Sequence, residues 1–169
     1  ALHACDTSAS GRFGQVSYRL LQDIRMSTLI QTQTTSFKVD VLSGVFDFSS
    51  DTSQAFKVAL YDGDAMNLDA STTAYTTTGE ITGTNYTAGG NTATLIPVTS
   101  DGTTATLSFN TVSWASATFS ASGALLYKSG SGNQAIAVLD FGGRKTVTSG
   151  TFNVTFPTNN ATSAIIRIA

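Results

Sequence analysis

Residues 123–141 read GALLYKSGSGNQAIAVLDF, and this stretch decides the fold. Apolar runs at 123–128 and 134–141 flank a segment of glycine, serine and asparagine at 129–133. Two strand-like runs joined by a short glycine-containing segment are typical of a β-hairpin. The sequence therefore predicts two antiparallel strands here, and similar runs on either side would extend the sheet.

Strand signals recur outside this hairpin. Residues 55–61 (AFKVALY) alternate, so Phe56, Val58 and Leu60 are expected on one face of a half-buried strand. Asp101-Gly102 is a turn signal between two further runs. The remaining strand signals lie at 92–98, 103–109, 151–156 and 163–168, and Trp114 and Phe119 lead into the run that begins at Gly123.

About eight strands, mostly antiparallel, predict an all-β domain with an antiparallel β-sandwich or jelly-roll-like architecture. The expected core consists of large apolar residues from these strands: Phe56, Val58, Leu60, Trp114, Leu125, Tyr127, Ile136, Val138, Phe152, Val154, Ile165 and Ile168.

One segment favours a short helix. Residues 36–48 (SFKVDVLSGVFDF) place apolar side chains at helical spacing, with Ser36 as the expected N-cap and Gly44 near the C-cap. Alternation over residues 37–41 leaves a strand as the alternative. Residues 65–91 are long and polar, and a loop of this length usually contacts a partner or carries short structure of its own.

The first 35 residues differ from the rest. They contain three of the five Arg residues, the only His (His3) and the only Cys (Cys5) of the sequence, and scattered apolar side chains. We expect residues 1–35 to form an extended N-terminal arm, with a short helix over 17–25, and residues 36–169 to form the β-sandwich domain.

Composition excludes several classes of function. Charged residues make up 12% of the chain and the net charge is −2, whereas nucleic-acid binding needs clustered Lys and Arg. No apolar run approaches the roughly 20 residues of a membrane span. Because His3 and Cys5 lie at the N-terminal end, the main body lacks the residues for a His/Cys metal site or a Ser-His-Asp triad. We therefore expect no catalytic residues, no cofactor and no metal.

The carboxylates allow two interpretations. Asp62, Asp64 and Asp69 could supply oxygens to calcium, but the Gly and terminal Glu of an EF-hand loop are missing, which favours solvated turn carboxylates. Glu80, the single Glu, could act with an Asp in glycoside hydrolysis. Its Thr- and Gly-rich surroundings favour a solvent-facing side chain instead.

Two further features also leave alternatives open. Residues 142–145 (GGRK) form either a turn with two exposed cations, which is favoured, or an anion site built on backbone amides. Trp114 is either a core residue, which is favoured, or an exposed sugar platform or interface anchor.

Several blocks of the sequence resemble small structural proteins of tailed bacteriophages. The blocks are TSFKVDVLSGVFDF from residue 35, FKVALYDGDAMNLDASTTAYTTTGEITGTNYTAGG from residue 56, GALLYKSGSGNQAIAVLDFGGRKTV from residue 123 and GTFNVTFPTNNATSAIIRIA from residue 150. The resemblance covers about residues 35–169, and it transfers no catalytic residues.

This resemblance implies a non-enzymatic virion protein. The expected role is a capsid decoration (cement) protein, a homo-oligomer on the capsid surface that binds and stabilises the shell of major capsid protein. The alternatives are a tail, neck or head-fibre component, or a receptor- or glycan-binding module with Trp114, Tyr75 and Tyr86 as platforms.

Aromatic and apolar anchors usually dominate protein interfaces. The expected partner contacts are therefore Phe13, Tyr18, Leu21 and Ile24 in the arm, and Tyr75 and Tyr86 in the long loop. Packing of each residue on its own domain is the alternative.

Overall fold

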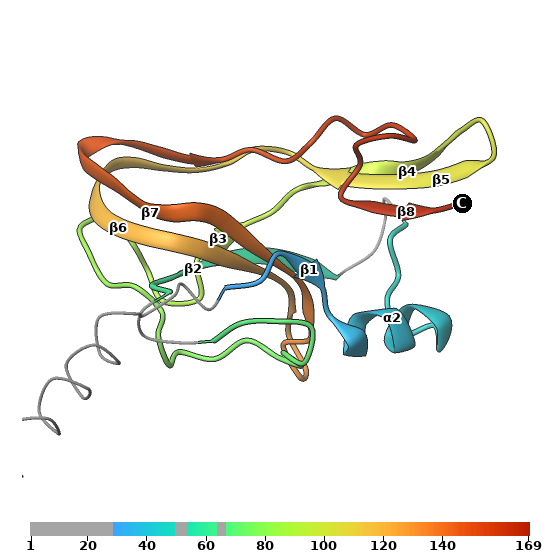
Figure 1. The fold of residues 1–169 in the computed structure, drawn as a ribbon, viewed down its shortest axis with the longest axis horizontal. Coiled ribbons are helices and arrows are strands. Elements are labelled where there is room, and N and C mark those ends of the chain that lie inside the picture. The colour runs from blue at the N-terminus through green and yellow to red at the C-terminus, as the bar shows by residue number, and fades with distance from the viewer. Residues whose placement is uncertain (1–28, 50–53, 64–66) are drawn as a thin grey trace, which may run out of the picture.

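The computed structural model describes residues 29–49, 54–63 and 67–169. Within these ranges the chain is an all-β, sandwich-like domain with one short helix, which confirms the predicted fold class (Figure 1). The elements in chain order are β1 (Thr32–Gln33), α2 (Thr35–Leu42), β2 (Ala55–Tyr61), β3 (Asn91–Thr92), β4 (Leu95–Asp101), β5 (Thr104–Phe109), β6 (Val112–Ser129), β7 (Ala135–Val154) and β8 (Ile166–Ile168).

The strands form two antiparallel sheets. One has the order β1-β7-β6-β2-β3, and the other has the order β4-β5-β8. In Figure 1, β6 and β7 run through the lower layer, turn at the left-hand end and return in the upper layer toward β4, β5 and β8. The two sides of the sandwich are therefore joined by one long, bent hairpin.

The predicted hairpin at 123–141 is confirmed, but its strands continue well beyond the predicted ends. Pairing passes from Gly123↔Asp140 to Ala121↔Lys145, so four residues of β7 are accommodated opposite one residue of β6. Gly142 and Gly143 lie within this bulge at φ 65° and 123°. Glycine adopts such angles without strain, so the pair lets β7 turn a corner and stay hydrogen-bonded, whereas the sequence favoured a turn at residues 142–145.

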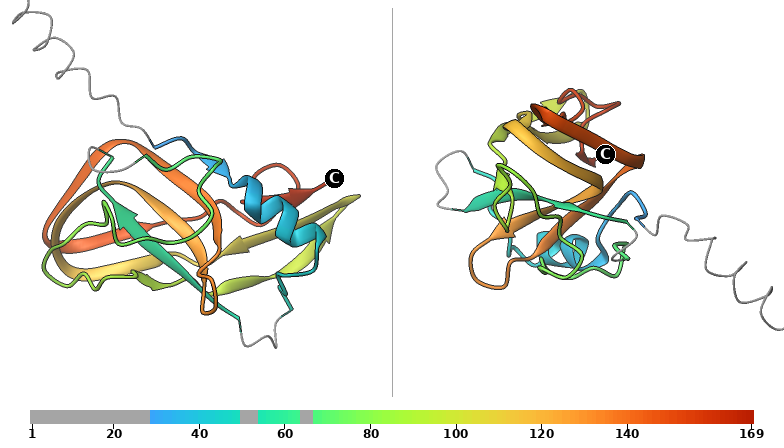
Figure 2. Two further views of the ribbon diagram at one scale, coloured as in Figure 1. Left: turned by 90° about the horizontal axis from the view of Figure 1, so that it is seen from below. Right: turned by 90° about the vertical axis from the view of Figure 1, so that its left-hand side faces the viewer.

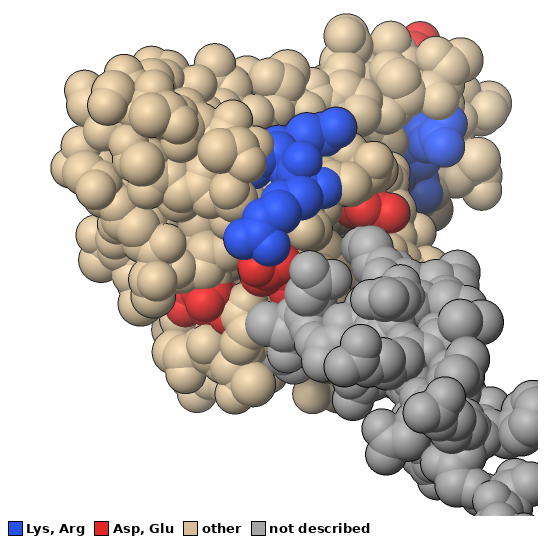
Figure 3. All heavy atoms as spheres, turned by 60° about the vertical axis from the view of Figure 1, so that its left-hand side comes forward, with Lys and Arg blue, Asp and Glu red and all other residues tan. Residues whose placement is uncertain are grey.

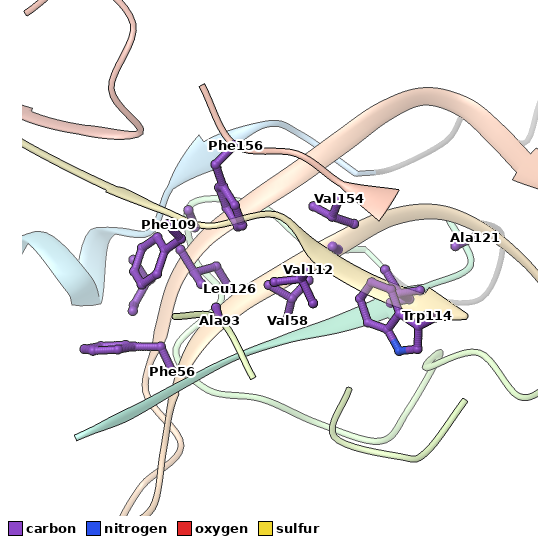
Figure 4. Close-up of a cluster of buried hydrophobic side chains, with 14 of the residues drawn as sticks. Phe56, Val58, Ala93, Phe109, Val112, Trp114, Ala121, Leu126, Val154 and Phe156 are labelled. Atoms are coloured by element: carbon purple, nitrogen blue, oxygen red, sulfur yellow. The ribbon is translucent and has the colours of Figure 1, made fainter. Parts of the chain in front are cut away.

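The main core lies between the two layers (Figure 4). It joins Phe56 and Val58 of β2 to Phe109, Trp114 and other buried side chains of the long hairpin and the small sheet. Nine of the twelve predicted core residues are buried, and Phe152 and Ile165 are partly buried against the core. Ile168 is an incorrect prediction, because it is 60% exposed and Ile166 is buried instead.

The outer face of the five-stranded sheet is also covered. A second cluster packs there, formed by Leu29, Ala59, Tyr61, Leu68, Leu125, Tyr127, Ala135 and Val138. Strand β2 was expected to be half-buried, but residues on both of its faces are buried, as in a central strand of a covered sheet. The cover is formed by Leu29 and by the long segment after β2, here called the covering loop (residues 67–90), which forms short bridges to Leu29, β2, β6 and the β6–β7 turn.

The predicted helix is present and begins earlier than expected. Thr34, not Ser36, is the N-cap, because its side chain accepts a hydrogen bond from the amide of Phe37. Gly44 follows the C-cap Ser43 at φ 72°, as the glycine signal indicated.

The boundary between arm and domain also differs from the prediction. Leu29 is buried in the second cluster, and β1 pairs with β7. Residues 29–35 are therefore part of the domain, and residues 1–28 lie outside the described ranges. The predicted helix over 17–25 lies outside them as well.

Candidate functional site

The sole glutamate lies at the centre of a hydrogen-bonded group that fixes the covering loop. The Glu80 carboxylate accepts bonds from the hydroxyls of Tyr75 (2.6 Å) and Tyr86 (2.6 Å) and from the amide of Gly89 (2.7 Å). We call these residues, with Tyr127, the tyrosine–glutamate cluster. Bonds to a carboxylate are stronger than neutral ones, so Glu80 joins three points of the loop.

The same cluster is attached to the sheet below it. Tyr86 Oη also accepts a bond from the amide of Leu60 in β2, and Tyr127 Oη donates to the carbonyl of Gly89. The ring of Tyr75 stacks on that of Tyr127, with centroids 4.8 Å apart. Glu80 is therefore half-buried and structural in its contacts, in contrast to the solvent-facing side chain that the sequence favoured.

Burial and the nearby carboxylate both act on the tyrosines. Desolvation, followed by the charge of Glu80, raises the pKa of Tyr127 to about 12. Desolvation and the hydrogen bond to Glu80 raise the pKa of Tyr75 and Tyr86 well above the usual value. The pKa of Tyr61 is also raised, chiefly by burial. All four hydroxyls are thus held in the neutral, hydrogen-bonding form.

One close backbone approach keeps the loop against the sheet. Gly90 lies at φ 68°, and a Cβ atom there would be 1.8 Å from the carbonyl oxygen of Val58. Only glycine fits this contact, so the position depends on the absence of a side chain.

A polar cleft of about 380 Å³ lies at the corner where the long hairpin bends. Asp62 and Glu80 line it with Arg144 and several threonines, and Arg144 Nη1 lies 2.8 Å from Asp62 Oδ2. Figure 3 shows basic side chains gathered beside acidic ones on a face that is otherwise largely uncharged. Both oxygens of Glu80 already accept hydrogen bonds and Asp62 is paired, so this arrangement favours a structural role over an acid–base pair.

The opposite end of the sandwich carries an apolar groove of about 320 Å³. It lies between α2 and the β4-β5-β8 sheet, and Figure 2 (left) shows the helix alongside that end of the molecule. Its apolar lining comes from the helix, the segment after it and the small sheet: Phe37, Val41, Leu42, Phe48, Val98, Ala105, Leu107, Ile166 and Ile168. We call this surface the apolar groove.

The apolar groove exposes large apolar side chains to water. Leu42 is 90% exposed, Val98 is 50% exposed and Ile168 is 60% exposed. Lys38 and Arg167 also line it, and within the described ranges no Asp or Glu does. A contiguous apolar surface with a polar rim is typical of a protein-binding site.

The predicted partner contacts are only partly placed by the structure. Tyr75 and Tyr86 are half-buried, with hydroxyls bonded to Glu80, which is the local packing left open as the alternative. Phe13, Tyr18, Leu21 and Ile24 lie outside the described residues. The groove was missed because its residues are far apart in sequence, although the run of apolar residues in 36–48 was a signal.

For Trp114 and Asp69 the structure supports the alternative that the sequence favoured, a core residue and a turn carboxylate. Trp114 is buried, with its ring against Phe119 and Phe152, so it is a core residue and not an exposed platform. Asp69 accepts bonds from the amide and hydroxyl of Ser71, which lower its pKa. Across residues 29–49, 54–63 and 67–169 no group of three potential metal ligands occurs. Asp64 lies outside these ranges.

Comparisons with protein-family models, with curated proteins and with solved structures find no match for this chain. No helix in the described part of the chain is long and apolar enough to cross a membrane. The resemblance to bacteriophage structural proteins therefore rests on the sequence blocks alone, and function must be argued from the surface of the domain.

Proposed function

We propose that this protein is a non-enzymatic structural component of a tailed-bacteriophage particle, and specifically a capsid decoration protein that binds the shell of major capsid protein. The observation that carries the proposal is the apolar groove, a protein-binding surface on a domain whose polar clusters are occupied by internal contacts. The sequence blocks that resemble phage structural proteins are the basis for assigning the protein to a bacteriophage particle.

The physical basis is burial of apolar surface. Covering exposed Leu42, Val98 and Ile168 with a neighbouring protein removes apolar area from water, which favours association by roughly 25 cal/mol per Å² before the costs of binding. Because the decoration protein would bind the assembled shell in preference to its free subunits, it would stabilise the shell by mass action.

Retention on purified particles tests the proposal. The double variant Leu42→Gln/Val98→Gln should lower the copy number on the particle and its thermal stability. The matched control is Ile30→Gln/Val39→Gln, which changes two comparably exposed apolar residues outside the groove. Equal loss with both variants, or no loss with either, would contradict a groove-mediated capsid role.

The number of copies per particle separates the capsid role from a tail, neck or fibre location. A decoration protein is present in hundreds of copies, whereas those components occur in a handful. Quantitative gel densitometry against the major capsid protein decides between them. The alternative of a receptor- or glycan-binding module is weakened, because Trp114, one of its expected binding residues, is buried.

The predicted arm contacts are tested separately. Removing residues 1–25 deletes Phe13, Tyr18, Leu21 and Ile24 and leaves every described residue in place. We expect lower retention on the particle with an unchanged unfolding midpoint. Unchanged occupancy would remove the arm from the proposal while leaving the groove variants as an independent test.

A further inference from the structure

The apolar groove lies beside a strand with a free edge. Strand β8 pairs with β5 on one side and is the last strand of its sheet, so among the described residues no strand pairs with its other side. About half of the backbone amides and carbonyls of an edge strand point away from its neighbour, ready to pair with another chain.

The groove and the edge form one surface. Ile166, Arg167 and Ile168 of β8 all line the groove. Gln33 of β1 also lines it, and its Nε2 donates to the carbonyl of Ile165 at the start of the free edge (3.0 Å). An added strand would therefore begin beside Gln33 and could place alternate side chains over the apolar floor.

Charge narrows the choice of occupant. Lys38 is an exposed cation on the rim of the groove, whereas the guanidinium of Arg167 donates to the carbonyls of Ala161 and Thr162, and within the described ranges the lining includes no carboxylate. The same groove of a second copy would bring like charges together. Residues 1–28 of this chain carry three Arg against two Asp, so their net charge of +1 is not complementary either.

We propose that the apolar groove binds an extended, acidic segment of another protein, added as a strand on the free edge of β8. Its backbone pairs with β8, its alternate apolar side chains cover Leu42, Val98 and Ile168, and its carboxylate faces Lys38. This is strand addition, in which backbone bonds give affinity and the groove selects side chains. Assigning the segment to a shell subunit rests on the function proposed above, whereas the binding mode does not.

A random 12-residue peptide library selected on the immobilised full-length protein tests the binding mode. The enriched peptides should alternate apolar residues and carry Asp or Glu. Peptides with apolar residues at helical spacing, basic peptides, or no enrichment would each overturn the proposal.

Matched variants locate the site. Ile168→Asp should lower the affinity for an enriched peptide by more than about 10-fold, because it places a carboxylate in the groove beside the carboxylate of the bound peptide. Ile30→Asp, equally exposed at 60% but outside the groove, should bind as the unaltered protein does. Lys38→Glu should also weaken binding, and Lys145→Glu on the bent part of β7 should not. Equal effects within either pair would overturn the proposal.

Two measurements distinguish a strand from other occupants. Amide exchange at residues 166–168 should slow when the peptide binds, and N-methylation of one alternate set of peptide amides should abolish binding while the other set tolerates it. Sedimentation of the free protein tests the alternative of a second copy. An oligomer that Ile168→Asp dissociates and Ile30→Asp does not would overturn the proposal.

The result is independent of the particle experiment. If peptides bind at β8 while groove variants are retained normally on particles, the capsid role fails and the binding mode stands. If retention depends on the groove but no acidic peptide is enriched, the binding mode fails and the capsid role stands.

Discussion

The outer face of the five-stranded sheet and the open end beside α2 differ in whether their apolar side chains are covered by the chain itself. On the outer face the covering loop buries a second apolar cluster and is fixed by bonds to Glu80. At the open end, Leu42, Val98 and Ile168 stay exposed around the apolar groove, with Lys38 on its rim. The first region completes its contacts within the chain, and the second leaves an apolar surface for another molecule.

The difference separates residues that maintain the fold from residues available for binding. The aromatic residues of the loop looked like interface anchors in the sequence, but their hydroxyls hold the loop in place. The residues that face outward are aliphatic. Substitutions in the two regions should therefore have opposite signatures, with stability affected on the outer face and binding affected at the open end.

The largest effect is expected from Gly90→Ala. Its Cβ would collide with the carbonyl of Val58, so the loop must move and its bonds to Glu80 and Tyr127 must weaken. We expect a loss of about 4 kcal/mol of unfolding free energy in urea titrations, from backbone strain plus broken bonds.

Gly44→Ala provides the matched control at the open end. Gly44 has nearly the same φ of 72°, but a Cβ there meets nothing within 4 Å. The expected loss is about 1 kcal/mol, which is the cost of the left-handed conformation alone. Similar losses for the two variants would show that the loop is not held by close contact with β2.

Removing the central carboxylate should have the next largest effect. Glu80→Ala leaves two tyrosine hydroxyls and the Gly89 amide without their acceptor in a half-buried site. A loss of about 3 kcal/mol is expected, and Glu80→Gln, which keeps one acceptor oxygen, should lose about half of that. Asp101, an exposed carboxylate that accepts one bond from the Ala161 amide, is the control, and its Ala variant should lose about 1 kcal/mol or less. Equal losses at Glu80 and Asp101 would contradict the cluster.

Local sequence patterns predicted the strands that form the outer face but not the way the covering loop packs on them. The hairpin at 123–141 and strand β2 follow from alternating apolar residues and glycine-rich turns. The cluster around Glu80 has no periodic signal. It depends on spacings of five, six and nine residues to Tyr75, Tyr86 and Gly89, and on loop geometry that becomes defined only against β2.

At the open end the β4–β5 hairpin follows from its turn signal, but β1 and β8 were harder to predict because they are short and pair over long sequence distances. Strand β1 has two residues, and its partners Ala137 and Val138 are more than 100 positions away. The choice of Ile166 over Ile168 as the buried residue depends on register with β5, where Ile166 pairs with Leu107. Periodicity alone assigns both isoleucines to the same face.

Alkaline pH should weaken the attachment of the covering loop through the four buried or half-buried tyrosines beneath and within it. In the unfolded chain tyrosine loses its proton near pH 10, whereas burial and Glu80 raise the pKa of Tyr127 to about 12 and raise those of Tyr61, Tyr75 and Tyr86 as well. Above pH 10 the unfolded state therefore binds fewer protons than the folded state, and stability falls as pH rises.

The measurement is the urea midpoint between pH 8 and pH 11.5, followed together with phenolate absorbance. Stability should be unaffected by these groups below pH 10, and phenolate should appear together with unfolding above it. Phenolate that forms in the folded protein near pH 10 would show that the tyrosines are accessible, and the contrast between the two regions would then weaken.

The smallest effect on stability is expected from Leu42→Gln. Leu42 is 90% exposed, so folding removes little of its side chain from water, and Leu and Gln have similar helix propensities. The change in unfolding free energy should be under about 0.5 kcal/mol, as for a typical surface position. A loss above 2 kcal/mol would mean that Leu42 packs within the domain, and the groove would then be part of the core.

The matched control is Val39→Gln on the same helix, which should change neither stability nor retention on the particle. If Leu42→Gln changes stability little but lowers retention, then the Leu42 side chain is needed for binding and not for folding. Such a residue would distinguish the open end from the loop-covered face by function as well as by exposure.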